Sequence, residues 1–162
     1  MPINGLRHGA MPSKSIMSDW QCLIDTSKVM SIAVADKGQV WSAPVYYLFT
    51  DKLFYFFSNP KARHIQLAEN TMAAASIFQD HADFNKLAGI QMAGTIVKSP
   101  LNAGSMAVAK HYCSHFKIMD NTRDVLGFFA SKFNAALFCF QADAVYYMDN
   151  SKGFGSREIV QL

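Results

Sequence analysis

Hydrophobic positions change their spacing along the chain, and each change predicts a different element. Between residues 15 and 28, apolar residues recur at steps of three and four, the period of one helix face. The segments 29–35, 39–49 and 53–58 are rich in β-formers and are separated by turn sequences, which is typical of consecutive strands. We expect these three strands to form a local antiparallel meander.

The remainder of the chain mixes helical and strand patterns without regular β-α-β alternation. The patterns predict three helices and three more strands: helices at 61–69, 103–116 and 122–132, and strands at 71–78, 88–97 and 136–148. Asn59 is expected to cap the first of these helices, with Pro60 as its first residue and Asn70 as a left-handed C-cap. About six strands with flanking helices predict an α+β protein built on an antiparallel barrel or sheet.

Three residues interrupt the strand patterns. Pro44 has no amide proton for a β-ladder, so it marks an edge strand, a bulge or a backbone left open to a ligand. Gly94 predicts a bulge or a close approach of two strands. Gln91 lies among apolar and small residues. It faces solvent on an edge strand, or it is buried and hydrogen-bonds a ring that carries donors and acceptors.

Length and composition limit the class of protein. The chain has 162 residues, of which 51% are hydrophobic and 13% aromatic, and its formal net charge is +3. We expect a flexible leader over 1–14 and a single domain over 15–162. The scattered cations do not predict nucleic-acid binding, and no apolar stretch is long enough to span a bilayer. Three cysteines without a CxxC motif indicate a reducing, cytoplasmic location.

Candidate chemistry is concentrated where the predicted strand 53–58 leads into a helix. Lys61, Arg63 and His64 place positive charge where unpaired backbone amides already attract anions, so a bound phosphate is one interpretation. A solvated basic helix start is the other. His111 and His115 share a helix face, but nothing completes a metal site, so no metal is predicted. No nucleophile, dinucleotide or P-loop motif is present, which is compatible with chemistry carried by a cofactor.

Several segments, in the same order along the chain, resemble the pyridoxamine 5′-phosphate oxidase-like FMN-binding split barrels. Within that family the similarity is greatest to the small bacterial YhbP-like proteins. The matching segments run from about residue 29 to 155 and include 41–49, 61–64, 89–94, 109–116 and 148–155.

This resemblance implies an antiparallel split barrel that forms a homodimer, with one FMN in each of two clefts between subunits. Lys61 and Arg63 take the phosphate, Ser58 and His64 assist, the strand around residues 43–46 lies against the flavin, and Gln91 contacts it. The loop 150–154 closes the site. The implied cofactor-binding residues are therefore Ala43, Pro44, Val45, Tyr46, Ser58, Lys61, Arg63, His64 and Gln91.

The family's basic substrate-binding residues near the C-terminus have no clear match, so pyridoxamine phosphate oxidase activity is not expected. The first hypothesis is an FMN-dependent oxidoreductase that uses a nicotinamide or another small electron donor or acceptor. The second is a non-catalytic flavin- or haem-binding module, because no acid, base or nucleophile is recognisable. A third is a structural dimer whose cleft has lost its ligand.

Overall fold

The computed structural model describes residues 17–68, 71–118 and 123–162, so the predicted leader and the predicted cap at Asn70 lie outside the described residues. Within them the chain forms eight strands, four α-helices and two short 3-10 helices. The strands are β1 (Val29–Asp36), β2 (Gln39–Tyr46), β3 (Leu48–Thr50), β4 (Leu53–Ser58), β5 (Ala73–Phe78), β6 (Ala88–Lys98), β7 (Ala136–Asp149) and β8 (Arg157–Ile159). The helices are α1 (Asp19–Thr26), α2 (Arg63–Ala68), η1 (Phe84–Lys86), α3 (Ala103–Phe116), α4 (Val125–Phe133) and η2 (Asn150–Lys152).

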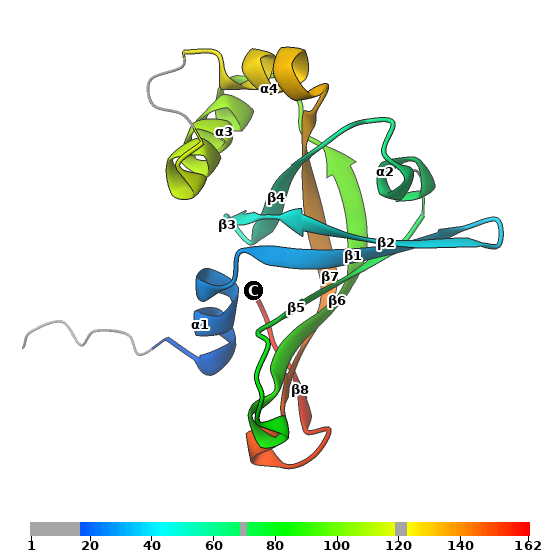
Figure 1. Cartoon of the computed structure of the whole chain (residues 1–162), viewed down its shortest axis with the longest axis vertical. Coiled ribbons are helices and arrows are strands. Elements are labelled where there is room, and N and C mark those ends of the chain that lie inside the picture. The colour runs from blue at the N-terminus through cyan, green and yellow to red at the C-terminus, as the bar shows by residue number, and fades with distance from the viewer. Residues whose placement is uncertain (1–16, 69–70, 119–122) are drawn as a thin grey trace, which may run out of the picture.

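All eight strands belong to one antiparallel sheet, which confirms the predicted α+β class. The strand order is β2-β1-β5-β6-β7-β4-β3, with β8 paired to the far part of β7. The sheet is strongly curled, and the long strands β6 and β7 run through its whole height (Figure 1). The six strands expected from the pattern become eight because the segment 39–49 is divided and the short, exposed β8 has no hydrophobic pattern that would predict it.

The barrel closes at Tyr47, where the predicted strand 39–49 changes partners. Before this residue the chain pairs with β1, and Tyr47 itself still donates its backbone N–H to Lys28 O at 3.1 Å. After it, Leu48 pairs with Tyr55 on β4. The predicted meander is therefore wrong in part: two hairpins form, but β2 and β4 are not paired along a shared length. The Tyr47 ring turns into the core, and its hydroxyl donates to Ile24 O at 2.6 Å.

The main core lies on the concave side of the sheet. Alternate residues of the strands point inward, and α1 and α2 cover the same side with their apolar faces. The fully buried large side chains are Phe54, Phe56, Phe140, Ile24, Met30, Ile32, Ile77 and Ile90. This alternation is the pattern that predicts the strands, because it separates a buried face from an exposed one.

A second, smaller core lies on the convex side. The pair α3–α4 packs there against the outward-facing residues of β4 and the start of β7, near the upper end of the molecule (Figure 1). Phe57 and Phe129 stack with ring centroids 3.7 Å apart. Helix α3 has the predicted bounds because Asn102 caps its first turn and Lys117 ends it in a left-handed conformation.

Gly94 confirms the expected bulge. The register between β6 and β7 shifts between Ala93 and Gly94, and a Cβ atom on Gly94 would collide with the backbone of Gln141. Only glycine allows the two strands to approach this closely. Among the described residues, no helix is both long and apolar enough to cross a membrane.

Candidate functional site

The convex side of the sheet is covered only in part. Helices α3 and α4 protect β4, the start of β7 and the end of β2 at Tyr46, whereas within residues 17–68, 71–118 and 123–162 no helix packs on the rest of the outward faces of β2, β1, β5 and β6. Directly paired residues in antiparallel strands share a face, so the register defines which side chains meet there. One row of small residues crosses this uncovered face, and it comprises Ser42, Ala33, Ala74, Ala93 and Ala144.

A shallow groove of about 710 Å³ lies over this row of small residues. Its walls are hydrophobic, and three of the side chains along it, Val40, Trp41 and Met72, are 75%, 45% and 57% exposed. Single exposed apolar residues are ordinary, but a contiguous apolar groove is typical of a binding site or an interface. We refer to this feature as the outer groove.

Beside the outer groove runs a second row, which is polar. Pro44 pairs with Ser31, Ser31 with Ser76, Ser76 with Gln91, and Gln91 with Tyr146. The register therefore sets two hydroxyls, an amide and a phenol side by side on one face, and we call this set the polar row. Gln91 is half-buried on a central strand, so the alternative of an edge strand is wrong, although the side chain does face outward.

Sequence reasoning finds only Gln91 in the polar row. Ser31, Ser76 and Tyr146 lie on three other strands, and which of them oppose Gln91 depends on pairings between distant parts of the chain. The only local signal is that each is a polar residue at an outward position in a strand that alternates. Pro44 begins the row on β2, which is the last strand on its side of the sheet order, as its missing amide proton predicts.

The predicted flavin strand 43–46 presents two faces. The side chains of Pro44 and Tyr46 point outward, whereas Ala43 and Val45 pair with Ile32 and Met30 on the core side. A ligand on the convex face can therefore contact Ala43 and Val45 only through the backbone of β2. Tyr46 lies at the boundary of the covered region. Its ring meets Phe116 edge-on at 5.4 Å, and its carbonyl accepts a 3.2 Å hydrogen bond from Tyr112.

The cationic turn after β4 differs from the prediction. Asn59 does not cap a helix: its Oδ1 accepts from Lys61 N at 2.8 Å, and its carbonyl accepts from Ala62 N at 2.8 Å. These bonds close a turn over 59–62, and α2 begins at Arg63. Asparagine favours such turns as strongly as it favours helix N-caps, and Pro60 suits either position. Lys61 consequently lies in the turn, exposed to solvent, rather than in the first helical turn.

Arg63 joins this turn to the outer groove. Its guanidinium carbon lies 4.9 Å from the centre of the Trp41 ring, and Nη2 donates to Gln39 Oε1 at 2.9 Å. Trp41 also lines the groove, but it pairs with the buried Val34, so its ring lies on the core-side face of β2. The cation therefore stands beside the groove, at the β2 edge of the sheet. Arginine has five N–H donors in a planar fork, so one hydrogen bond to Gln39 leaves donors that can meet an anion.

His64 and Ser58 form a buried pair beneath the turn. Ser58 Oγ and His64 Nε2 are 2.9 Å apart, and both residues are 9% exposed. Burial lowers the pKa of His64, because the charged imidazolium loses its hydration. A lowered pKa disfavours the charged form of His64, so His64 is a weaker source of positive charge than Lys61 or Arg63, and its contact with Ser58 holds α2 against the end of β4. The cationic groups of the turn are Lys61 and Arg63.

The two histidines of α3 are exposed, as expected for a helix surface. His115 Nε2 lies 2.9 Å from Lys28 Nζ, which ties α3 to the start of β1. The pKa of His115 is lowered by burial and by the nearby Lys28 and His111. At the opposite end of the sheet, Phe154 of the C-terminal loop stacks on Phe84, with centroids 5.3 Å apart. This loop is far in the chain from the cationic turn, and both rings are exposed.

The fold shared with known structures defines the class. A FAD-binding protein from Mesorhizobium loti superimposes with a TM-score of 0.61 at 19% identity, covering 90% of this chain and 96% of the other. A pyridoxinephosphate oxidase family protein from Clostridium acetobutylicum, related to general stress protein 26, gives 0.58 at 16%, covering 89% and 92%. HutZ, a haem storage protein from Vibrio cholerae, gives 0.63 at 11%, covering 77% and 88%. The chain thus has the split-barrel fold of the pyridoxamine 5′-phosphate oxidase-like proteins.

Sequence similarity over nearly the whole chain identifies a more specific group of relatives. UPF0306 protein YhbP from Escherichia fergusonii is 24% identical over 152 residues, which are 92% of this chain and 93% of that protein. The expected similarity to the YhbP-like split barrels is therefore confirmed. No family model matches the sequence.

Proposed function

We propose that this protein binds FMN on the convex face of its sheet and acts, as a homodimer, as an oxidoreductase that uses a nicotinamide or another small electron donor. The observation that carries the proposal is the polar row beside the outer groove, with a cationic turn beside the groove at the β2 edge of the sheet. The solved neighbours described as FAD-binding and as members of the pyridoxinephosphate oxidase family support a flavin as the class of cofactor.

The donor set matches a flavin ring. Its pyrimidine portion carries carbonyl acceptors and an N–H donor along one edge, and its dimethylbenzene portion is apolar. Gln91 supplies both a donor and an acceptor, and the hydroxyls of Ser31 and Ser76 can do either. Alanines of the neighbouring row offer a flat surface against which a planar ring can lie. In the bound state these groups would fix the ring's orientation and exclude water from one of its faces.

Haem fits this face less well. A haem iron is usually held by an axial histidine, cysteine, methionine or tyrosine. Within the described ranges, neither the row of small residues nor the polar row contains a histidine or cysteine, and His64 is already paired with Ser58. Tyr146 is the one residue of those two rows that could bind iron. A flavin needs hydrogen bonds rather than a metal ligand, so it can use both the polar side chains of one row and the flat alanine surface of the other.

Lys61 and Arg63 would hold the phosphate. Lys61 is exposed on the turn, and Arg63 is oriented by Trp41 and Gln39 beside the outer groove. Arginine and lysine bind phosphate through charge-assisted hydrogen bonds, which are about twice as strong as neutral ones. FMN, when bound, supplies hydride and single-electron transfer. The chain's residues would therefore anchor, orient and shield the cofactor and leave the redox chemistry to it.

A second copy of the chain would cover the rest of the convex face. The outer groove and its exposed apolar residues form a hydrophobic surface, and its exposure to water is unfavourable for a monomer. A twofold contact through the row of small residues would let two sheets approach closely, because these side chains are short. Flavin at the margin of such an interface would then be enclosed from both sides.

The decisive experiment measures FMN affinity by quenching of flavin fluorescence. Lys61→Ala/Arg63→Ala is expected to weaken binding at least tenfold, since each lost charged hydrogen bond to phosphate is worth about 1.5–3 kcal/mol. A matched control is Arg123→Ala/Lys132→Ala, which removes the same charges from exposed positions near and on α4. FMN binding that is equal in the two double variants and the wild type would refute the phosphate site.

The second candidate, a non-catalytic binding module, has one observation in its favour. The polar row contains serine, glutamine and tyrosine side chains but, among the described residues, no carboxylate or imidazole that could act as acid or base. Stopped-flow mixing of the FMN-loaded protein with reduced nicotinamides separates the candidates. Bleaching of the flavin absorbance indicates the oxidoreductase, and an unchanged spectrum with both donors indicates the module.

A further inference from the structure

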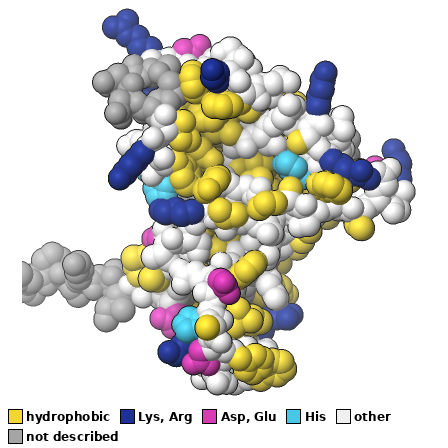
Figure 2. Space-filling view, in the orientation of Figure 1, with side chains coloured by type: hydrophobic (Ala, Val, Ile, Leu, Met, Phe, Trp, Pro, Cys, Tyr) yellow, Lys and Arg dark blue, Asp and Glu magenta, His cyan; other side chains and the backbone are white. Residues whose placement is uncertain are grey.

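Two adjoining cavities lie at the upper end of the barrel, away from the outer groove. The larger, of about 360 Å³, is bounded by α2 and the ends of β6 and β7, and the smaller, of about 230 Å³, reaches α4. Pro60 and Lys98 line both, so the two cavities meet at these residues. In the space-filling view, hydrophobic side chains line the surface between the α3–α4 pair and α2, with cationic side chains projecting around it (Figure 2).

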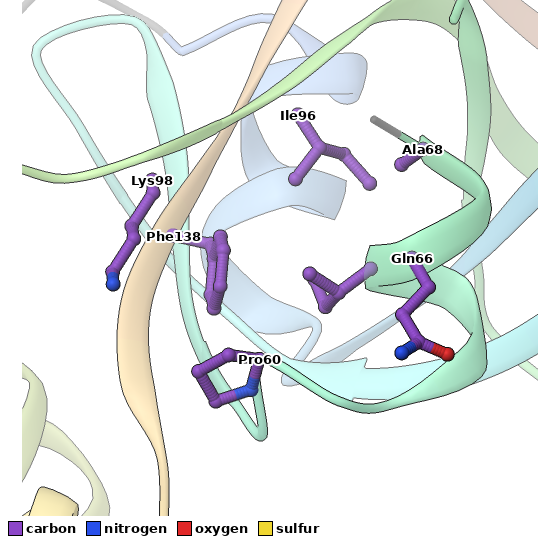
Figure 3. Close-up of a pocket in the computed structure, with 7 residues that line it drawn as sticks. Pro60, Gln66, Ala68, Ile96, Lys98 and Phe138 are labelled. Carbon is purple, nitrogen blue, oxygen red and sulfur yellow. The ribbon is translucent and has the colours of Figure 1, made fainter. Parts of the chain in front are cut away.

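The larger cavity has apolar walls and polar margins. Ile65 and Ala68 come from α2, Ile96 from β6 and Phe138 from β7. Figure 3 shows the rings of Phe138 and Pro60 beside the aliphatic chains, with the Gln66 amide at one margin and the Lys98 side chain at the opposite one. A hydrophobic space with a few polar groups at its rim is the usual design of a small-molecule site.

Lys98 is the one charged residue among the described residues that line either cavity. It ends β6 opposite Phe138, and Figure 3 shows its side chain at the outer margin of the cavity, with the ammonium pointing away from the Phe138 ring. A compact ammonium on a flexible stem can meet an anion from a range of directions. The cavity therefore selects for negative charge at one end of a hydrophobic ligand.

Ser99 lines the smaller cavity and carries a buried hydroxyl without a hydrogen-bond partner among the described residues. Ser99 is 9% exposed, its backbone N–H donates to Leu137 O at 2.9 Å, and its Oγ has no hydrogen-bond partner of good geometry. The thiol of Cys139 faces it, but a thiol is a weak partner. A buried hydroxyl without a partner loses free energy on folding unless a ligand or water reaches it. The Ser99 Oγ is itself fully buried, and Ser99 follows Lys98 directly in the chain, so the two side chains point to opposite faces of the sheet and the hydroxyl is not part of the anion site.

We propose that these cavities bind a small monocarboxylate with a hydrocarbon body. The body occupies the larger cavity between α2 and Phe138. The carboxylate lies where the two cavities meet, paired with Lys98. A volume of 360 Å³ accommodates about 12 non-hydrogen atoms at about 30 Å³ each, the size of a medium-chain fatty acid.

This site is separate from the proposed flavin site. Its lining shares no residue with the outer groove, and it lies beside α2 and α4 at the end of β6 rather than over the row of small residues. Lys61 is adjacent to Pro60 in the chain but lines neither cavity. Binding of a carboxylate is therefore expected with or without FMN, and failure of either proposal leaves the other standing.

Isothermal titration calorimetry with octanoate tests the proposal. Octan-1-ol has the same chain without the charge, and butyrate has the charge without the chain. Octanoate is expected to bind at least tenfold more tightly than either, because only octanoate fills the cavity and pairs with Lys98. Equal binding of octanoate and octan-1-ol would overturn the assignment of an anion site, and absence of octanoate binding would overturn the site altogether.

Charge variants complete the test. Lys98→Met keeps the apolar stem and is expected to weaken octanoate binding about tenfold, whereas Lys98→Arg is expected to retain most of it. Lys37→Met, at an exposed hairpin turn, serves as the control that leaves octanoate binding unchanged. The same Lys98→Met protein is expected to bind FMN like the wild type. Octanoate binding by Lys98→Met that equals the wild type would refute the inference.

Discussion

Replacing Ala74 by arginine tests whether a second copy covers the convex face. Ala74 lies on β5 in the middle of the row of small residues, between Ala33 and Ala93, and its side chain is exposed in the isolated chain. Arginine at this position can extend into solvent and lay its stem along the neighbouring strand. The folding stability of the single chain should therefore change by less than about 0.5 kcal/mol, the usual range for surface substitutions.

The effect on a dimer is much larger. A stable interface buries about 800 Å² on each partner, and the centre of that area would be the outer groove. Twofold symmetry places two copies of the new arginine in this apolar centre without carboxylate partners. Burying an unpaired charge costs several kcal/mol, so the pair should weaken association by at least ~4 kcal/mol, about a thousandfold in the dissociation constant.

Light scattering after size exclusion measures the outcome directly. The wild type is expected to elute with twice the chain mass of 18.0 kDa, and Ala74→Arg with that mass alone at the same micromolar concentration. Ala107→Arg, at an exposed position on α3, is the matched control and should remain a dimer. A wild type that is monomeric at every concentration, or an Ala74→Arg protein that dimerises with unchanged affinity, would refute the reasoning.

Two further predictions concern the fold and can be measured by urea denaturation. Gly94→Ala should destabilise the protein by about 2 kcal/mol, because the new Cβ meets the Gln141 backbone and the cost of overpacking exceeds the entropic gain of removing a glycine; an unchanged midpoint contradicts this. Because the pKa of His64 is lowered in the folded state, the unfolded chain binds more protons than the folded chain as the pH falls. The free energy of unfolding is therefore highest above the ordinary histidine pKa of about 6.5 and decreases as the pH drops below it. His64→Gln should reduce this fall between pH 7 and 5, and an unaltered pH dependence excludes His64 as its source.

Local patterns predict those elements whose boundaries depend on neighbouring residues. At the start of α3 the side chain of Asn102 caps the first turn, which is a signal carried by the residue type itself, whereas the left-handed Lys117 at its end is not a residue type that predicts a helix end. Gly94 is recognisable as a bulge because a glycine in a strand interior usually marks a bulge or a close approach of two backbones. Asn59 is wrongly predicted as a cap because an asparagine side chain stabilises both helix starts and turns. Which of the two forms depends on the direction in which the chain leaves β4.

Pairing between distant strands cannot be predicted in the same way. The break at Tyr47 follows from the closure of the barrel, where one segment must satisfy β1 and then β4. The polar row has the same origin, because Ser31, Ser76 and Tyr146 become neighbours of Gln91 only through three separate registers. Sequence reasoning finds the one member of the row whose residue type is unusual for its strand.

The cationic turn shows how the fold changes the role of a motif. The sequence places three basic residues beside one helix start: Lys61, Arg63 and His64. The simplest interpretation is that all three side chains bind a phosphate. The structure separates them: His64 turns inward to Ser58, and burial lowers its pKa, whereas Arg63 is directed onto Trp41 beside the outer groove. The proposed phosphate site therefore relies on Lys61 and Arg63, and Trp41 orients Arg63 within it.

A ligand that uses both the turn and the polar row must be long enough to extend from the turn along β2. Three strand spacings of about 4.8 Å separate Pro44 from Gln91 within that row, so the ligand must also be broad. A phosphate joined by a flexible chain to a wide planar ring has that shape, whereas a free phosphate or a small organic anion would engage the turn and leave the row without a role.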